Sequence, residues 1–371
     1  MKLAVLKERG SGEARVAVTP EIARKYIQAG FAVALEAGAG LESEFSDDVY
    51  AKAGVSVSSA AEALAGADIL LAVRPPEAEL LQRLPENGWL IGMLEPHRLD
   101  AHLPSLSQRG LTAFSLELLP RISRAQGMDV LSSQSNLAGY RAVIEAVAAL
   151  RKAVPMMMTA AGTVAPAKAL VLGAGVAGLQ AIATARRLGA VVTAFDVRAA
   201  AKEQVESLGA KFIAVASDEK GEAKGGYAKE MSEDYQRRQR ELIHEVAVKQ
   251  DMIVTTALVP GKPAPVLITE ETVRAMKPGA VIVDLAAASG GNCPLTEPDQ
   301  AVDIGGVTLI GFTNLPSRVA ADASPLYARN LFNFVTGLLV KDGRLEPNWD
   351  DELITGTMLT RNGQVVHAGF R

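Results

Sequence analysis

The stretch Ala169-Leu170-Val171-Leu172-Gly173-Ala174-Gly175-Val176-Ala177-Gly178 decides the fold. Its four leading apolar residues predict a buried strand, and a helix predicted from Leu179 to Leu188 follows, ended by Gly189. A GxGxxG pattern alone is a weak signal, but between a strand and a helix it is typical of a turn that binds the pyrophosphate of a dinucleotide. The first glycine permits the tight turn, the second lets the backbone approach the pyrophosphate, and the third allows close helix–strand contact.

Asp196 ends the next predicted strand, 23 positions after Gly173. A carboxylate at this position accepts hydrogen bonds from the adenosine ribose hydroxyls, and its charge repels a 2′-phosphate, which favours NAD over NADP. Arg198 could answer such a phosphate, but with Asp196 so close we interpret it as a surface residue. The alternative for the whole motif is a glycine-rich turn that binds no ligand.

Short apolar runs alternate with amphipathic stretches over most of the chain, which predicts parallel βαβ units and doubly wound sheets. The predicted strands are Lys2–Leu6, Phe31–Glu36, Ile69–Val73, Trp89–Met93 and Thr112–Ser115 in a first group, and Lys168–Leu172, Val191–Asp196, Lys211–Ala214, Met252–Thr255, Ala280–Asp284 and Val307–Gly311 in a second. A long, mostly helical stretch, Ser133–Val154, lies between the two groups. Ser324-Pro325 is expected to start a late helix. Asn362-Gly363 predicts a type I′ turn in a C-terminal hairpin that packs on the first domain.

The expected fold class is therefore α/β, with two Rossmann-like doubly wound domains joined by long helices. The first, discontinuous α/β domain is expected at residues 1–132 and 315–371, and the NAD-binding Rossmann domain at residues 133–314. A length of 371 residues suits this plan, since about 100–200 residues make one domain.

Composition excludes several classes of protein. With 38 Lys+Arg against 42 Asp+Glu, the formal charge of −4 offers no general attraction to nucleic acid or to an anionic membrane. Nowhere do about 18 apolar residues follow one another, so no transmembrane helix is expected. The one cysteine, Cys293, cannot form an intramolecular disulfide, which favours a cytosolic setting. The four histidines lack metal-ligand spacing, so no metal site is expected.

A charged, glycine-bearing stretch, Ser217–Ser232, interrupts the pattern of strands and helices. A loop of about 16 residues inside a compact domain is uncommon and is usually functional or disordered. Tyr227 is its only aromatic residue. The stretch is either a solvated loop or a lid that closes on a ligand.

A polar segment, Pro120–Asn136, lies where the two domains should meet. Its Arg, Gln, Asp and Ser side chains could bind a carboxamide, a ribose or a phosphate. Equally, the segment could be a helix start with capping Ser and Asn and an Arg–Asp pair. The sequence offers no convincing group for proton transfer, and His97 is the only histidine placed near an expected interdomain position. Hydride exchange between two nicotinamides needs no such group; it needs positioned rings and excluded water.

The segment PRISRAQGMDVLSSQSNLAGYR (Pro120–Arg141) closely resembles the NAD(H)-binding alpha component of proton-translocating NAD(P) transhydrogenases. The resemblance spans nearly the whole chain, and the RISRAQ…DVLSSQSN block is highly specific. It continues at Lys7–Pro20, Met156–Lys168, Gly173–Gly178, Gly225–Met231, Thr255–Thr269 and Asp284–Cys293.

This resemblance implies two α/β domains with NAD(H) in the interdomain cleft, and a homodimer. It implies docking on an NADP(H)-binding beta subunit and a membrane-spanning subunit, so that hydride passes between NAD(H) and NADP(H) while protons cross the membrane. The chain would be cytoplasmic and peripheral, held at the inner face of the plasma membrane by its partners. No metal and no nucleic acid are implied.

Matched position by position, the resemblance also implies roles for individual residues. The residues implied to position the nicotinamide are Arg121, Gln126, Asp129 and Ser132, with Tyr227 on a mobile loop that closes over the nucleotide. The implied cofactor-binding residues are Leu131, Gly173, Gly175, Val176, Gly178, Asp196, Val197, Arg198, Gly226, Gln239 and Leu258. Departures from the family pattern are Gly127, where serine is familiar, and Ala287-Ala288-Ser289, where a more polar run is common.

Two alternatives remain beside this hypothesis. Alanine dehydrogenases share the fold and the KERG…RVAVTP pattern near the N-terminus, but they use a lysine and a histidine on the amino acid. Arg74 stands where that lysine is expected, which weakens this alternative. The third hypothesis is a non-catalytic NAD sensor, against which the RISRAQ block argues.

Overall fold

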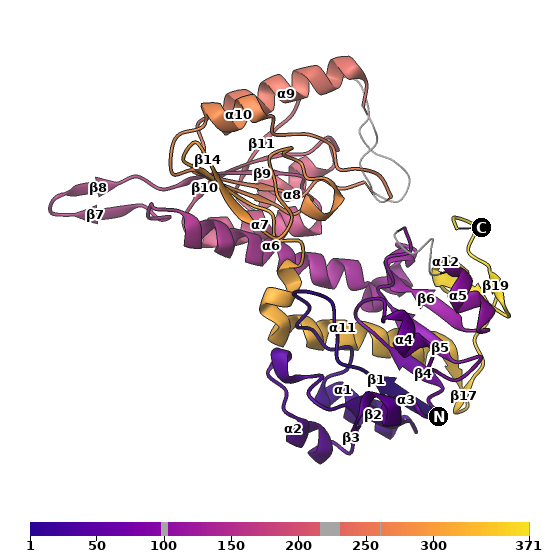
Figure 1. Cartoon of the computed structure of the whole chain (residues 1–371). Coiled ribbons are helices and arrows are strands. Elements are labelled where there is room, and N and C mark those ends of the chain that lie inside the picture. The colour runs from indigo at the N-terminus through magenta and orange to yellow at the C-terminus, as the bar shows by residue number, and fades with distance from the viewer. Residues whose placement is uncertain (98–102, 216–230, 260, 371) are drawn as a thin grey trace. The chain divides into compact units, whose positions relative to one another are not determined.

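The computed structural model describes residues 1–97, 103–215, 231–259 and 261–370. The chain divides into two compact units, one made of Met1–Gln134 and Pro316–Arg371 and the other of Ser135–Leu315. The division after Gln134 falls within helix α6 (Val130–Ala149), so this helix contributes to both units. Each unit is built on its own twisted sheet, and the α/β fold class is confirmed (Figure 1).

The first unit has an eight-stranded sheet in the order β19-β18-β6-β5-β4-β1-β2-β3. Its strands are β1 (Lys2–Val5), β2 (Ala32–Glu36), β3 (Ser56–Ser58), β4 (Ile69–Leu71), β5 (Trp89–Gly92), β6 (Thr112–Ser115), β18 (Met358–Arg361) and β19 (Gln364–Val365). Its helices besides α6 are α1 (Pro20–Gln28), α2 (Asp47–Lys52), α3 (Ala60–Leu64), α4 (Ala78–Leu81), α5 (Leu103–Gln108), α11 (Ala320–Phe334) and α12 (Glu352–Thr357). Strands β1 to β6 pair in parallel, as the βαβ pattern predicts.

The C-terminal hairpin completes this first sheet. Strand β18 pairs antiparallel with β6, and β19 pairs antiparallel with β18. Asn362 and Gly363 have φ of 50° and 77°, the positive values that a type I′ turn requires. Both the predicted turn and its position against the first domain are confirmed. A small hairpin of β16 (Val340–Lys341) and β17 (Arg344–Leu345) precedes it.

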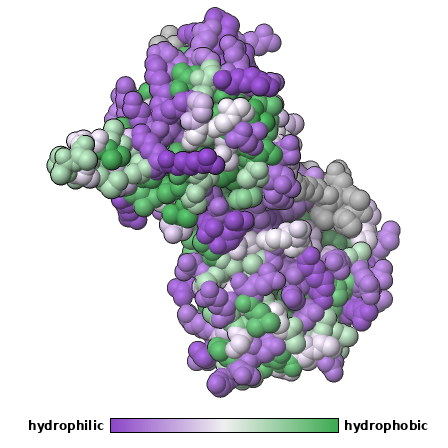
Figure 2. All heavy atoms as spheres, turned by 60° about the vertical axis from the view of Figure 1, so that its left-hand side comes forward, coloured by the Kyte–Doolittle hydropathy of each residue, from purple (hydrophilic) through white to green (hydrophobic). Residues whose placement is uncertain are grey.

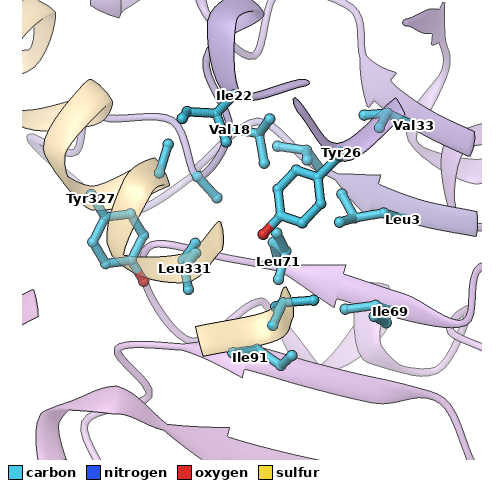
Figure 3. Close-up of a cluster of buried hydrophobic side chains, with 14 of the residues drawn as sticks. Leu3, Val18, Ile22, Tyr26, Val33, Ile69, Leu71, Ile91, Tyr327 and Leu331 are labelled. Atoms are coloured by element: carbon cyan, nitrogen blue, oxygen red, sulfur yellow. The ribbon is translucent and has the colours of Figure 1, made fainter. Parts of the chain in front are cut away.

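Helix α11 closes the core of the first unit (Figure 3). Tyr327 is fully buried; its hydroxyl donates to the Ala72 carbonyl at 2.7 Å and accepts from the Met93 N–H at 3.1 Å. These two bonds tie the late helix to the carboxyl ends of β4 and β5. Tyr26, also buried, packs edge-on against Phe332 with ring centroids 4.9 Å apart. The C-terminal segment is thereby part of the first unit's core.

The second unit has a seven-stranded sheet in the order β11-β10-β9-β12-β13-β15-β14. Its strands are β9 (Lys168–Leu172), β10 (Val191–Phe195), β11 (Lys211–Ile213), β12 (Met252–Thr255), β13 (Val281–Asp284), β14 (Ala301–Ile304) and β15 (Val307–Ile310). Its helices besides α6 are α7 (Val176–Arg187), α8 (Ala201–Ser207), α9 (Glu233–Ala247) and α10 (Glu270–Ala275). Only the edge strand β14 runs antiparallel within this sheet. The order 3-2-1-4-5 of its first five strands is that of dinucleotide-binding sheets.

A separate hairpin projects from the second unit (Figure 1). It consists of β7 (Met157–Thr159) and β8 (Gly162–Val164), and every residue of both strands is exposed. The exposed fractions of Met156, Met157 and Met158 are 60%, 43% and 78%. This arm is not among the elements predicted from the sequence.

One predicted helix boundary is wrong. Helix α11 begins at Ala320 and contains Pro325, whereas Ser324-Pro325 was expected to start it. Proline lacks an N–H and so removes one backbone hydrogen bond, here to the Ala321 carbonyl one turn earlier. Packing of the buried residues Ala323 and Tyr327 against the first unit outweighs that loss.

Candidate functional site

The glycine turn after β9 has the backbone that the motif predicts. Gly173 has φ of 98°, and its N–H donates to the Phe195 carbonyl at 2.8 Å. A Cβ added to Gly178 would lie 1.8 Å from the Gly173 carbonyl oxygen, and one added to Gly173 would lie 2.5 Å from Thr256 Oγ1. Any side chain at these two positions would push α7 away from the sheet.

The middle glycine differs from the other two. A Cβ on Gly175 would meet nothing within 4 Å, so this side of the turn faces open space. Helix α7 begins directly after it, at Val176, with no side-chain cap and no acidic residue in its first turn. The first N–H groups of a helix have no intrahelical partner and attract anions. The turn therefore fits the pyrophosphate of a dinucleotide, bound by backbone alone.

Asp196 lies beside this turn, directly after β10, and its side chain is only 6% exposed. Its Oδ2 accepts the Ala174 N–H at 2.7 Å, which ties the carboxylate to the glycine turn. Its Oδ1 accepts the Arg198 N–H at 2.8 Å. The backbone thus fixes the orientation of the carboxylate.

The side chain of Arg198 pairs with the same carboxylate. Its Nε donates to Oδ1 of Asp196 at 2.9 Å and its Nη2 donates to Oδ2 at 2.8 Å. This is a bidentate pair, and the Arg198 side chain is 21% exposed. The interpretation of Arg198 as a surface residue is wrong, because the short chain turn after Asp196 brings its guanidinium back onto the carboxylate.

Two residues that hold this site in shape are not among those predicted from the sequence. Thr256 Oγ1 donates to the Gly173 carbonyl at 3.1 Å, from the loop after β12. Asn292, fully buried, donates to the carbonyls of Ala257 and Pro265 at 2.9 and 2.8 Å and accepts the Ala257 N–H at 3.1 Å. Asn292 lies in a stretch that carries the family resemblance, but nothing in its sequence neighbourhood indicates a bracing role.

The other predicted residues of the second unit have different environments. Gln239 is buried on α9, Val197 is half-buried, and Leu258 is 45% exposed in the loop after β12. Gly226 and Tyr227 lie outside the described residues, so the lid hypothesis for that loop stays a prediction. Ser232, at the end of the same stretch, caps α9 by accepting the Tyr235 N–H at 3.2 Å.

The polar segment Pro120–Asn136 belongs largely to the first unit and leads into α6. Asp129 accepts the Ser132 N–H at 2.9 Å on Oδ1 and the Ser132 hydroxyl at 2.5 Å on Oδ2, which caps the helix. Arg121 and Gln126 are exposed, and Leu131 is half-buried. The segment is therefore a helix start, capped by Asp129 rather than by Ser or Asn, with polar side chains still presented to solvent.

Contacts from the C-terminal segment hold this helix start. The expected Arg–Asp pair forms between Arg124 and Asp351, at 2.8 and 2.6 Å, and not with Asp129. The Gly127 carbonyl accepts the side-chain amides of Asn330 and Asn333 at 2.9 and 2.8 Å. These bonds fix the backbone on which Gln126 and Asp129 stand.

A second charged cluster, also not predicted from the sequence, lies at the carboxyl ends of β1 and β4 in the first unit. Glu8 accepts the N–H groups of Val73 and Arg74 at 2.6 and 3.2 Å. Arg15 donates to Glu13 at 2.7 and 2.6 Å, and both side chains are at most 2% exposed. Burial, aided by the nearby Glu13 charge, raises the pKa of Glu8 to about 7.

Other carboxylates and arginines border this cluster. Arg74 donates to Glu13 at 3.2 Å and pairs with Glu95, and Glu117 accepts the Glu95 N–H at 2.7 Å. Burial also raises the pKa of Glu117. Because each arginine in the cluster is already paired with a carboxylate, the cluster does not favour a further anionic ligand.

Within the part of the chain that the structure describes, no three His, Cys, Asp or Glu side chains are grouped so that they could bind a metal ion. Among the same residues, no helix is both long enough and apolar enough to cross a membrane.

Both units match one protein family. The family description "Alanine dehydrogenase/PNT, N-terminal domain" matches residues 4–138, and "Alanine dehydrogenase/PNT, C-terminal domain" matches residues 142–368. The chain belongs to the alanine dehydrogenase/PNT family.

Within this family the transhydrogenase members are the more similar. An NAD(P) transhydrogenase subunit alpha chain of Rhodospirillum rubrum is 54% identical over 376 residues, covering 99% of this chain and 98% of that protein. A transhydrogenase crystal structure from Sinorhizobium meliloti superposes with a TM-score of 0.90 at 48% identity, covering 99% of this chain and 100% of that one. An alanine dehydrogenase of Halomonas elongata is 29% identical over 96% of this chain and 92% of its own length. The resemblance to transhydrogenase alpha components is confirmed.

Proposed function

We propose that this chain is the NAD(H)-binding alpha subunit of a proton-translocating NAD(P) transhydrogenase. In this role it passes hydride between its own NAD(H) and NADP(H) on a partner subunit, coupled to proton movement across a membrane. The single observation that carries the proposal is the 54% identity, over 99% of the chain, to the Rhodospirillum rubrum alpha subunit. The open glycine turn and the adjoining Asp196 supply the matching chemistry.

In this proposal the second unit binds the adenosine and pyrophosphate end of NAD(H). The N–H groups at the start of α7 bind the pyrophosphate, and Gly175 leaves room for it. Asp196 accepts the ribose hydroxyls. Gln239, Leu258 and the loop that bears Gly226 and Tyr227 contribute further contacts.

The first unit is proposed to bind the nicotinamide end. Arg121, Gln126, Asp129 and Ser132 orient the carboxamide and the ribose, and Leu131 lines the same pocket. The Asp129–Ser132 bonds and the amides on the Gly127 carbonyl hold these groups in fixed positions. Fixed positions are what hydride transfer needs, because the two C4 atoms must approach to near contact. These residues bind and orient; none of them moves a proton.

The main alternative is a soluble NAD-dependent alanine dehydrogenase. The alanine dehydrogenase relatives are distant, at 29% identity, against 54% for the transhydrogenase subunit. The first unit also argues against it. Arg74, at the position of the expected lysine, is paired with Glu13 and Glu95 and cannot act as a neutral amine.

A homodimer is proposed through the β7–β8 arm. Its two strands are exposed on both faces, and methionines stand at their start (Figure 2). An isolated two-stranded hairpin is marginal in water, so an arm of this kind favours a covering partner. A second copy of this chain is the proposed partner. Sedimentation of the variant Met156→Ser/Met158→Ser tests this: a dimer that dissociates supports the arm as interface, and an unchanged dimer contradicts it.

The remaining assignments follow from the proposed complex. NADP(H) is held by the beta subunit, and the chain is peripheral at the cytoplasmic face of the membrane through a membrane-spanning partner. No metal takes part.

Hydride exchange with a partner tests the function directly. The purified chain is mixed with an NADP(H)-binding transhydrogenase component, and reduction of an NAD analogue by NADPH is followed by absorbance. We expect exchange in the mixture and none from either component alone. A chain that binds NADH yet gives no exchange would contradict the proposal, and NAD reduction by alanine without any partner would establish the alternative.

A further inference from the structure

The ribose-binding carboxylate of the second unit is already occupied by the protein itself. Four donors converge on Asp196: the N–H groups of Ala174 and Arg198, and the Nε and Nη2 of the Arg198 side chain. A carboxylate has about four lone-pair positions, two on each oxygen. The ribose hydroxyls of NAD(H) therefore find no vacant position on this carboxylate.

The two kinds of donor differ in how easily they can leave. The Ala174 N–H is part of the glycine turn, and the Arg198 N–H is held by the chain directly after β10. The guanidinium hangs on a flexible side chain that is 21% exposed, so it can swing into solvent at small cost. When a ribose binds, the guanidinium is the donor that gives way.

The pair also changes the charge of the site. At the sequence level, rejection of a 2′-phosphate followed from the negative charge of Asp196. With Arg198 at 2.8 Å the pair is neutral, and the displaced guanidinium would stand beside the position of the 2′-hydroxyl. Arginine binds phosphate by the same bidentate geometry with which it binds carboxylate.

We infer that Arg198 is a second determinant of nucleotide choice: it competes with the ribose of NAD(H) for Asp196, and it offsets the charge by which Asp196 rejects NADP(H). This inference rests on the proposed function, since it takes NAD(H) to bind at this turn. Arg198 acts through Asp196 and is a positioning residue, not a catalytic one.

The test measures dissociation constants of NADH and NADPH for the full chain by fluorescence titration. Arg198→Gln removes the charge, and we expect it to tighten NADH binding about five-fold and to weaken NADPH binding about ten-fold. Asp196→Asn leaves the guanidinium unpaired, and we expect NADPH binding to tighten about ten-fold while NADH binding weakens. Arg198→Lys keeps the charge, and we expect the ratio of the two constants to stay near that of the wild type.

Arg187→Gln is the matched control, because it removes the same charge at the opposite, C-terminal end of α7, where the side chain is exposed. Its ratio of dissociation constants should equal that of the wild type. If Arg198→Gln weakens NADH and NADPH alike, or changes neither, the inference is wrong. If the wild-type chain itself binds no NADH, the proposed function fails, which is a separate result from a wild type that binds NADH and an Arg198→Gln variant with an unchanged ratio.

Discussion

Both units have a sheet whose first strand is flanked by the second strand on one side and the fourth on the other, so both have a topological switch point. In such sheets ligands bind beyond the carboxyl ends of the strands at this point. In the second unit a glycine turn follows the first strand, and Gly175 faces open space. In the first unit the chain after β1 carries Glu8, whose carboxylate accepts two N–H groups that follow β4.

The difference shows how one architecture can either bind an anion or contain its own. The first unit supplies a carboxylate at the position where the second leaves backbone N–H groups for a ligand. The same contrast holds for two helix starts: Asp129 caps α6, whereas α7 has neither a cap nor an acid in its first turn. Sequence changes should therefore affect stability at the first switch point and ligand binding at the second.

The largest effect is expected at the buried pair of the first unit. Arg15→Ala would leave Glu13 without its bidentate partner in a site where both side chains are at most 2% exposed. We expect the free energy of unfolding to fall by about 3–5 kcal/mol. Both tryptophans, Trp89 and Trp349, belong to the first unit, so tryptophan fluorescence in a urea titration reports this change.

An exposed pair in the same unit serves as control. Arg83 and Glu79 are 51% and 77% exposed, so Arg83→Ala should cost less than about 1 kcal/mol. NADH affinity should be unchanged in the folded form of both variants. A loss of NADH binding by folded Arg15→Ala would mean that the first switch point takes part in nucleotide binding.

The glycine turn of the second unit comes next. Gly178→Ala places a Cβ 1.8 Å from the Gly173 carbonyl oxygen, and we expect a loss of about 2–3 kcal/mol in stability together with NADH binding. Gly175→Ala meets no atom within 4 Å, so its stability should match the wild type while NADH binding weakens at least about ten-fold. Circular dichroism and NADH titration separate the two. Equal stability losses would show that Gly175 is structural.

The pKa of Glu8 predicts a dependence of stability on pH in the first unit. The pKa rises from 4.5 to about 7 on folding, so the folded state holds the proton more tightly. The first unit should therefore lose stability as the pH rises from about 4.5 to 7, by about 2 kcal/mol. Glu8→Gln should flatten this slope in urea titrations followed by tryptophan fluorescence. A slope as steep in the variant as in the wild type would assign the effect to Glu117 instead.

The smallest change in stability is expected at Asp129. Asn still caps a helix, so Asp129→Asn should lower the free energy of unfolding by only about 0.5–1 kcal/mol. If Asp129 positions the nicotinamide, hydride exchange should slow at least about ten-fold while NADH affinity changes little. Ser133→Ala, at a neighbouring hydroxyl that bonds Asn330, is a control for general loosening of the helix start. Equal losses in exchange and affinity would indicate binding without positioning.

The sequence predicts the strands well where a buried parallel strand gives a continuous apolar run. The predicted bounds for β9 and β12 are those observed, and β6 is also correct. The polar edge strand β3 and the antiparallel edge strand β14 were missed, because edge strands lack such runs. The β7–β8 arm was missed because its strands are three residues long and buried on neither face.

The candidate site was predictable in its residues but not in its contacts. The glycines and Asp196 follow from spacing along one strand–turn–helix unit. The Asp196–Arg198 pair depends on the direction of one flexible side chain, which spacing does not determine. The Glu8 cluster gathers residues from four separate loops, so only the fold brings them together.

The methionines at the start of the β7–β8 arm have a chemical consequence of their own. Thioethers exposed by 60% and 78%, at Met156 and Met158, are open to peroxide, whereas Met252 is 1% exposed. Oxidation to the sulfoxide turns an apolar side chain into a polar one, and dedicated reductases can reverse it. The arm therefore exposes a surface whose apolar character follows the redox state of its surroundings.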